Sequence, residues 1–317
     1  MRVVMINDCA FVGQTLLKTF PFWLKAVHIR RTRNIWSKTF GIALKTIGVN
    51  GDIYHVHYLL QDCFLASMLG KHPLIGHAHG SDLRKAINHR IWAGIVKHNL
   101  KSCSKILVST PDLLEKAKEF NNETEYLPNP FDRTLFYTRP KESQGRRIRV
   151  LLAGKSDWNL KRTDIAIRAL SNIKEYTKAS IVGYGKDFIK TINLAKALNL
   201  KLNILPKVSH DLIRNYYWSS DVVVDQFPDS GTIGNVGIEA IACGRPVITY
   251  IKSNLPEYHA FPLLDIRTEE DIERAILSPK KEVLWKKQYE YIRTRHDPEI
   301  VATRLIEIYK EVINQRQ

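Results

Sequence analysis

Short apolar runs alternate with longer amphipathic stretches along most of the chain. The short runs are rich in β-branched residues and bounded by Gly, Pro, Asp or Asn, which is typical of buried strands. They cover residues 3–7, 52–58, 73–79, 105–110, 149–154, 179–185, 202–208, 221–227 and 245–251. Helical spacing of apolar positions occurs between them, as in residues 62–70, 89–102, 163–173, 187–200, 209–220 and 235–244. This alternation predicts an α/β protein with parallel sheets covered by helices.

A proline-rich, charged stretch interrupts the alternation at residues 126–147, and we interpret its second half as a linker. Two doubly wound, Rossmann-like domains are therefore expected, at residues 1–140 and 141–294. Residues 295–317 are expected to form a helix that packs back on the N-terminal domain. Ligands of such sheets bind beyond the carboxyl ends of the strands, so we expect the site in the cleft that the two domains face.

Composition places the chain among ordinary globular proteins. It has 317 residues, of which 44% are hydrophobic, and no run approaches the ~18–20 apolar residues of a membrane-spanning helix. The N-terminus resembles a first strand more than a secretory leader. Cys9, Cys63, Cys103 and Cys243 are scattered without metal-ligand spacing, which predicts free, mostly buried thiols. We therefore expect a cytoplasmic protein.

The net charge of +16 favours phosphate-rich ligands or an anionic surface as partners. Residues 16–45 combine aromatic and aliphatic residues with many Lys and Arg and no acid. At helical spacing this is a basic amphipathic surface, suited to the inner face of an anionic membrane. A core-facing helix with a solvated basic side is the alternative. No nucleic acid is expected as a partner, because no nucleic-acid module is recognised.

The segment from Pro228 to Thr249 has the pattern of an anion site. A glycine-containing loop follows a predicted strand and leads into a helix, so backbone N–H groups near Gly234 can approach a phosphate. Glu239 lies about a turn and a half into that helix, where a carboxylate can accept both hydroxyls of a ribose diol. Together these features predict a nucleotide site. A structural glycine turn with a capping acid is the alternative.

The same segment, GTIGNVGIEAIACGRPVIT, resembles the C-terminal signature of retaining GT-B glycosyltransferases of the family 4 type. The resemblance continues in order along most of the chain, through DIYHVHY, PLIGHAHGSDLR, ILVSTPDLLE, YLPNPFDRTLF, LLAGKSDWNLKRTDIAIRAL, IVGYGKD and SSDVVVDQF. It implies the GT-B fold and a nucleotide-sugar donor linked to UDP or GDP, with no cofactor.

This sequence departs from the family pattern at several positions. The family commonly has two glutamates with seven residues between them; Glu239 matches the second, and the first falls on Gly231. The first basic position, usually Arg, is Lys155, and the second matches Lys161. The N-terminal glycine-rich loop is reduced to Gly13, which we assign to the donor site. The short N-terminal domain suggests a trimmed acceptor side.

Departure of a nucleoside diphosphate places negative charge on the leaving phosphate, which a site without a metal neutralises with cations and backbone dipoles. We expect Lys155 and Lys161 to do this, with the N–H groups of Ile233, Gly234 and Asn235. No Asp-x-Asp motif occurs in a suitable loop, so no essential divalent ion is expected. The resemblance implies a metal-independent hexosyltransferase with front-face attack and retention of configuration.

Several other candidate site residues have both a functional and a structural interpretation. The resemblance places His79 near the donor sugar, where it can hydrogen-bond a hydroxyl. A buried core histidine that the backbone satisfies is its alternative, and is the interpretation preferred for the histidines at 55, 57 and 77. Asp82 either caps the following helix or contacts sugar or acceptor. Asp229 is a possible substitute for the missing glutamate, and Lys186 a possible cleft residue.

The leading hypothesis is sugar transfer to a hydroxyl acceptor, plausibly a lipid-linked or cell-envelope glycan, by an enzyme that is peripheral on the membrane. A nucleotide-sugar epimerase on the same fold is a second hypothesis, although it would need further acids. A non-catalytic cationic binding module with a degenerate nucleotide site is a third.

Overall fold

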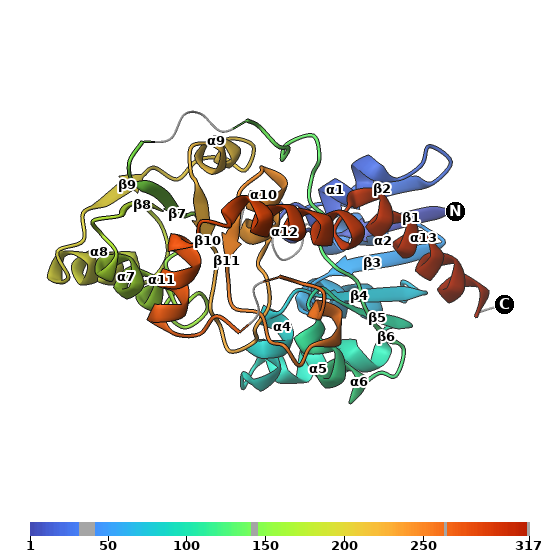
Figure 1. Cartoon of the computed structure of the whole chain (residues 1–317). Helices are drawn as coiled ribbons and strands as arrows, with labels where there is room; N and C mark the ends of the chain where they lie inside the picture. The colour runs from blue at the N-terminus through green and yellow to red at the C-terminus, as the bar shows by residue number, and fades with distance from the viewer. Residues whose placement is uncertain (32–41, 141–144, 263–264, 316–317) are drawn as a thin grey trace. The chain divides into compact units, whose positions relative to one another are not determined.

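The chain folds into two compact units (Figure 1). The computed structural model describes residues 1–31, 42–140, 145–262 and 265–315. The first unit comprises Met1–Pro130 and His296–Gln317, and the second comprises Phe131–Arg295. Residues 131–140, which the sequence assigned to the first domain, belong to the second unit because Phe131 and Phe136 are buried in its core.

The first unit is built on a six-stranded sheet in the order β2-β1-β3-β4-β5-β6, in which every neighbouring pair is parallel. Its strands are β1 (Arg2–Ile6), β2 (Lys25–Ile29), β3 (Ile53–His57), β4 (Leu74–Ala78), β5 (Lys105–Val108) and β6 (Thr124–Tyr126). Its helices are α1 (Val12–Thr19), α2 (Ile42–Ile47), α3 (Gln61–Met68), α4 (Ser81–Arg84), η2 (Ala86–Asn88), α5 (Trp92–Ser102), η3 (Pro111–Leu113), α6 (Leu114–Lys118) and α13 (Pro298–Asn314).

The second unit has a five-stranded parallel sheet in the order β11-β10-β7-β8-β9. Its strands are β7 (Ile148–Leu152), β8 (Thr177–Val182), β9 (Leu202–Leu205), β10 (Val222–Val224) and β11 (Val247–Ile248). Its helices are α7 (Thr163–Asn172), α8 (Phe188–Ala197), α9 (Ile213–Trp218), α10 (Asn235–Ala242), η4 (Pro256–Tyr258), α11 (Glu269–Leu277) and α12 (Lys281–Arg295).

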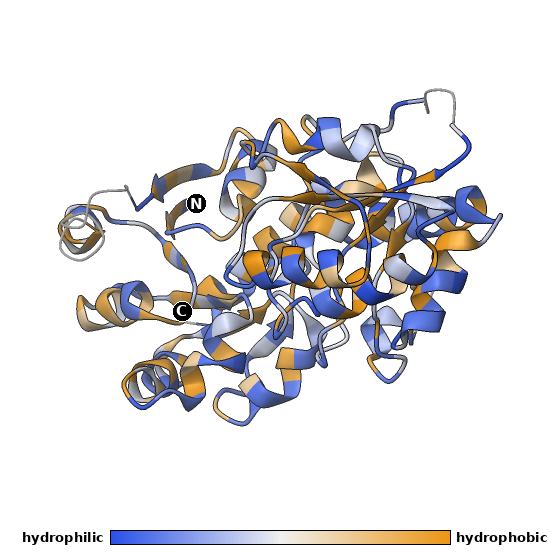
Figure 2. Cartoon of the chain, turned by 90° about the vertical axis from the view of Figure 1, so that its left-hand side faces the viewer, coloured by the Kyte–Doolittle hydropathy of each residue, from blue (hydrophilic) through white to orange (hydrophobic). Residues whose placement is uncertain are grey.

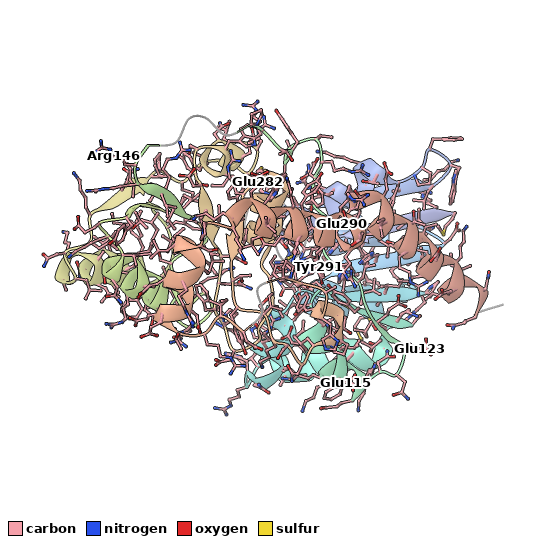
Figure 3. The ribbon with its side chains drawn as sticks, in the orientation of Figure 1. Glu115, Glu123, Arg146, Glu282, Glu290 and Tyr291 are labelled. Carbon is pink, nitrogen blue, oxygen red and sulfur yellow. The ribbon has the colours of Figure 1, made fainter. Side chains whose placement is uncertain are left out.

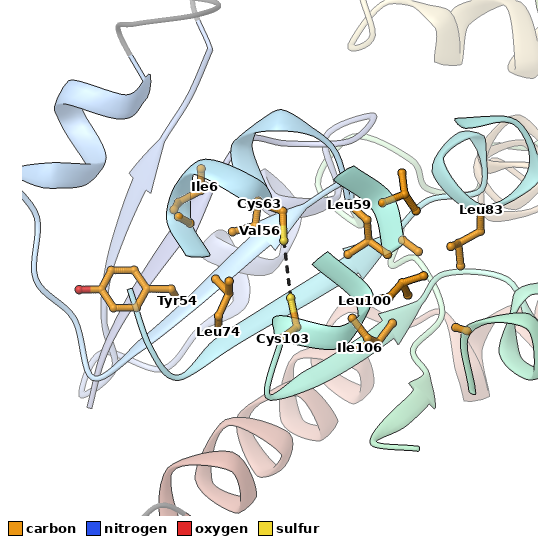
Figure 4. Packing of buried hydrophobic residues seen from close by; sticks show 14 of the residues in the cluster. Ile6, Tyr54, Val56, Leu59, Cys63, Leu74, Leu83, Leu100, Cys103 and Ile106 are labelled. Atoms are coloured by element: carbon orange, nitrogen blue, oxygen red, sulfur yellow. Dashed lines mark hydrogen bonds between the residues drawn. The ribbon is translucent and has the colours of Figure 1, made fainter. Parts of the chain in front are cut away.

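Each sheet is covered on both faces, as continuous apolar strands require. Along β1, Val4 and Ile6 face a core that includes residues of α3 and α5, whereas Val3 and Met5 face α1 and α13. Figure 4 shows the first of these cores, where the sulfur atoms of Cys63 and Cys103 lie 3.6 Å apart. All four cysteines are free thiols, as the sequence predicted.

The helices are amphipathic: in Figure 2 they carry both apolar and hydrophilic residues, as elements with one side on a sheet and one in solvent must. The described part of the chain holds no helix with the length and apolar character needed to cross a bilayer.

Residues 16–45 do not form one helical surface. Helix α1 ends at Thr19, before Pro21, which has no N–H to continue a helix. The chain then enters β2, an edge strand that pairs with β1, and later α2. Residues 32–41, the middle of the predicted basic surface, lie outside the described residues.

Candidate functional site

A lysine and a buried aspartate meet at the carboxyl ends of β7 and β10 in the second unit. Lys161 Nζ lies 3.4 Å from Oδ1 of Asp225, whose side chain has no exposed surface. Lys161 Nζ also contacts Oε1 of Gln226. Lys155 and Lys161 line one small hollow together with Asp225. The two predicted cations are therefore neighbours beside a carboxylate that the sequence analysis did not identify.

The backbone N–H of Gly234 donates to Asp225 Oδ2 at 2.6 Å. We expected this N–H to bind phosphate, so the structure corrects that assignment: in this chain the carboxylate is its partner. A side chain at Gly234 would place a Cβ 2.9 Å from both Asp225 oxygens and from Lys161 Nζ. Ile233 is buried in the core, and Asn235 begins α10. The glycine is thus required for the close approach of loop, lysine and carboxylate.

A second loop packs backbone to backbone against the residues that follow β7. Ser156 donates its N–H to Tyr184 O at 2.9 Å and accepts from Asp187 N at 3.1 Å. Gly185 has φ +118°, and an added Cβ would lie 2.3 Å from Ser156 O. This contact holds the segment that carries Lys155.

Lys186 is half-exposed, and its Nζ lies 3.2 Å from Oδ1 of Asp157. Burial raises the pKa of Asp157, but hydrogen bonds from Leu160 N–H and from Lys186 more than offset this, so its pKa is lowered overall. The structure therefore assigns Lys186, in the loop after β8, an ion pair that neutralises Asp157 in the segment after β7.

Glu239 lies on α10 and is held through both carboxylate oxygens. His210 Nε2 is 2.7 Å from Oε1, and the Tyr217 hydroxyl donates to Oε2 at 3.0 Å. Burial, together with the Glu239 charge, raises the pKa of Tyr217 well above its ordinary value, which keeps its hydroxyl a donor. Each carboxylate oxygen retains a second lone pair, so two acceptor positions remain for a ligand.

Sequence reasoning missed His210 and Tyr217. His210 follows β9 and so lies, like the other polar residues of this site, beyond the carboxyl end of a parallel strand. That position was the signal by which it could have been found. Tyr217 lies inside α9, and no sequence signal distinguishes it from an ordinary buried tyrosine.

The missing first glutamate has a structural reason. Gly231 has φ +57°, and a Cβ there would lie 2.7 Å from Lys252 N and 2.3 Å from Lys252 Cγ. A glutamate at this position would require the Lys252 backbone to move. Asp229 is exposed in the same turn, which the Gly231 N–H closes with Pro228 O at 2.9 Å.

In the first unit, Asp82 is a structural residue. It is fully buried, and its carboxylate accepts from the backbone N–H groups of Leu59, His79, Gly80 and Leu83 at 2.9–3.2 Å. Burial raises its pKa, while these hydrogen bonds oppose the rise. Asp82 is not the cap of the following helix, because it lies inside α4, whose N-cap is Gly80. Its carboxylate instead holds the backbone of the segments that follow β3 and β4, and we do not assign it a contact with sugar or acceptor.

His79 follows β4, and its Nε2 lies 2.8 Å from His57 Nδ1. Within the described residues its Nδ1 is buried and has no hydrogen-bond partner, which leaves this atom for a ligand. Gly13 opens α1 and donates its N–H to Asp8 Oδ1 at 2.8 Å. A Cβ at Gly13 would lie 3.0 Å from His57 Nε2, so the glycine permits the loop after β1 to approach this imidazole.

The other three histidines are buried, but the expectation that backbone groups satisfy them is wrong. Their hydrogen-bond partners are one another, His79 and Tyr309. Burial lowers the pKa of His55 to about 3 and the pKa values of His57 and His77 well below 6.5, so these rings are neutral at neutral pH.

Residues 147–278 match the family model described as Glycosyl transferases group 1. The comparison with curated protein sequences gives no match.

Solved structures resemble the whole chain in fold. Sucrose-phosphate synthase from Thermosynechococcus elongatus matches with a TM-score of 0.75 and 15% identity, over 99% of this chain and 100% of that one. Anabaena HepE in complex with UDP-glucose matches with a TM-score of 0.76 and 12% identity, over 98% and 100%. The lipopolysaccharide outer core galactosyltransferase WaaB matches with a TM-score of 0.66 and 13% identity, over 98% and 100%.

Proposed function

We propose that this chain, whose residues 147–278 belong to the group 1 glycosyl transferases and whose two sheets have the GT-B fold, transfers a sugar from a nucleotide-sugar donor to a hydroxyl acceptor. The observation that carries the proposal is the arrangement at the carboxyl ends of the second sheet. Two lysines, a glycine loop and a buried carboxylate lie together inside the matched domain.

The lysines supply the charge that a leaving diphosphate requires. Asp225 and Gln226 hold the Lys161 ammonium close to the start of α10, and Lys155 lines the same hollow. Positive groups fixed before the reaction stabilise developing negative charge without reorganisation. This supports a transfer step that needs neither a cofactor nor a divalent ion at the donor.

Glu239 is the proposed acceptor for the ribose hydroxyls. His210 and Tyr217 restrict its rotation and leave two lone pairs for a diol. We propose a UDP- or GDP-linked hexose as the donor, since a solved relative in fold contains UDP-glucose. His79 Nδ1 is the proposed hydrogen-bond partner of a sugar hydroxyl, and we propose that the reaction retains the anomeric configuration.

A screen of UDP-, GDP- and ADP-linked sugars by thermal shift tests the donor site. We expect at least one nucleotide to raise the melting temperature of the native chain, because a ligand that binds only the folded state stabilises it. Glu239→Ala should lower the affinity for that nucleotide by about 10- to 100-fold. This corresponds to the loss of ~1.5–3 kcal/mol of binding free energy from hydrogen bonds to a charged group.

The matched control is Glu290→Ala, which removes an exposed carboxylate on α12 that pairs with Arg293 (Figure 3). This variant should retain native nucleotide affinity. No shift with any nucleotide would overturn the donor site, and a full shift in Glu239→Ala would remove Glu239 from it. Release of an epimerised sugar nucleotide without acceptor would contradict the transfer reaction.

The acceptor is proposed to be a lipid-linked or cell-envelope glycan at an anionic membrane. Phe22 is 99% exposed, and Trp23, 46% exposed, lies under the ammonium of Lys310 at 5.6 Å. Exposed aromatic residues beside cations suit the interface of an anionic bilayer. Arg31 of the basic stretch 16–45 is already ion-paired with Asp62. The membrane proposal therefore rests on Phe22 and Trp23 and not on the arginines of that stretch.

Flotation with vesicles tests this surface. We expect the native chain to float with phosphatidylglycerol-containing vesicles and Phe22→Ser to lose most of that binding, because a fully exposed phenyl ring is the group that inserts. Ile91→Ser, which removes a 71% exposed residue of the same unit, is the control and should float normally. Equal flotation of Phe22→Ser and the native chain would contradict the assignment.

A further inference from the structure

Four histidines form a two-by-two array on one face of the first sheet. His55 and His57 are two residues apart in β3, so their side chains share one face of the sheet. His77 lies in β4 opposite His57, and His79 follows β4. Centroids of neighbouring rings are 4.2–5.3 Å apart. The first three side chains, which we call the histidine cluster, have no exposed surface.

The array cannot satisfy its own ring nitrogens. His55 Nδ1 lies 2.6 Å from the Tyr309 hydroxyl, and its Nε2 lies 3.2 Å from His77 Nδ1. His57 Nδ1 bonds to His79. His57 Nε2 and His77 Nε2 are then buried without a hydrogen-bond partner among the described residues. A neutral imidazole has one donor and one acceptor, so no choice of tautomers provides partners for these atoms.

Orphaned polar atoms at this depth are rare in folded proteins, so the hydrogen bonding of this array is incomplete. We propose that His55, His57 and His77 bind one transition-metal ion of the zinc class. One ring nitrogen from each of the three residues lies within 4.8 Å of the other two. The proposal rests on these ring nitrogens and not on the glycosyltransferase function.

The spacing is close to that of a metal site. Zn–N bonds of about 2.0–2.1 Å put the nitrogens of a tetrahedral site roughly 3.4 Å apart. His55 Nε2 and His77 Nδ1 already have this separation, at 3.2 Å. A metal ion between them replaces the hydrogen bond that they share. A His57 nitrogen lies within 4.8 Å of the other two, so it would have to approach them by at most roughly 1.4 Å to complete three ligands. The fourth position is then free, as in three-histidine zinc sites.

The chemistry of the cluster suits the same ion. Imidazole nitrogens are ligands that Zn, Cu, Fe and Ni accept. When His55 Nδ1–H donates to the Tyr309 hydroxyl, the lone pair of His55 is placed on Nε2, which faces His77. Tyr309 lies on α13, so the ion joins β3 and β4 to the C-terminal helix.

The test measures bound metal directly. The full chain is unfolded with chelator, refolded with or without Zn²⁺ or Co²⁺, desalted, and analysed by elemental analysis and by the visible absorption of Co²⁺. We expect about one ion per chain and a higher melting temperature in the metal-loaded protein. His57→Gln and His77→Gln should retain less than a tenth of the native metal. His98→Gln, which alters a histidine of α5 that bonds to Ser67, should retain all of it.

Tyr309→Phe keeps the packing of the ring and removes only the hydroxyl. This variant should therefore fold even if His57→Gln and His77→Gln do not. It should weaken metal affinity by about 10- to 100-fold, as loss of the hydrogen-bond partner of a ligand does. Native protein that binds no metal after refolding with Zn²⁺ or Co²⁺, or cluster and Tyr309 variants that bind as much metal as His98→Gln, would overturn the site.

Discussion

Replacing Lys161 by alanine should lower kcat for sugar transfer by about 10²- to 10³-fold. Its ammonium lies beside Asp225 and the start of α10, where charge on the leaving diphosphate is expected. Loss of one fixed group that stabilises such charge costs about 2.7–4 kcal/mol. Steady-state kinetics on the donor found by the thermal-shift screen would measure kcat and KM separately.

Two further variants separate chemistry from folding. Lys161→Ala leaves the buried Asp225 without its cation, which lowers stability as well as rate. Combining it with Asp225→Asn removes that charge and should restore stability but not kcat. Lys196→Ala, an exposed lysine of α8, should change neither. Native kcat in Lys161→Ala would contradict the role of this lysine.

Gly185→Ala should destabilise the second unit by about 3 kcal/mol or more. The backbone φ of +118° is unfavourable for any residue with a Cβ, which costs ~1–3 kcal/mol, and contact with Ser156 backbone atoms at 2.3–2.4 Å adds an overpacking cost of ~1–3 kcal/mol. The loop that carries Lys155 packs on this glycine, so nucleotide binding should fall as well.

The same substitution at Gly94 is the control. Gly94 lies in α5, and an added Cβ there meets nothing within 4 Å. Gly94→Ala should therefore raise stability by about 0.5–1 kcal/mol, because alanine loses less backbone entropy in a helix. Calorimetry would measure the melting temperatures of Gly185→Ala and Gly94→Ala. Equal melting temperatures would contradict the prediction, because they would show that the backbone at Gly185 accommodates a Cβ without loss of stability.

Sequence analysis located every strand of the sheet interiors, and also β9 and β11, the two edge strands of the second sheet. Runs such as 3–7 and 221–227 are apolar on both faces, because each lies between two layers of helices. The missed strands, β2 and β6, are sheet edges with exposed or half-buried residues, so their sequences carry little apolar signal. For the same reason the stretch 16–45 was mistaken for a helical surface.

The candidate site was predicted in part. The spacing of a glycine loop before a helix indicated Gly234 and Glu239, and the family resemblance indicated Lys161. Their partners could not be predicted. Asp225 belongs to an apolar strand run, and His210 lies 29 residues from Glu239. The spacing of residues along the chain does not predict which side chains come into contact in the folded protein.

By itself, the sequence determined the α/β class, the order of the two strand arrays and the family resemblance, since these follow from periodicity and local motifs. Tertiary structure decided the rest. It gave the Gly234 N–H to Asp225, made the Asp82 carboxylate an acceptor for backbone N–H groups, excluded a side chain at Gly231, and brought His55 of β3 against His77 of β4 and Tyr309 of α13. Each of these depends on contacts between residues distant in sequence, which only strand register and helix packing establish.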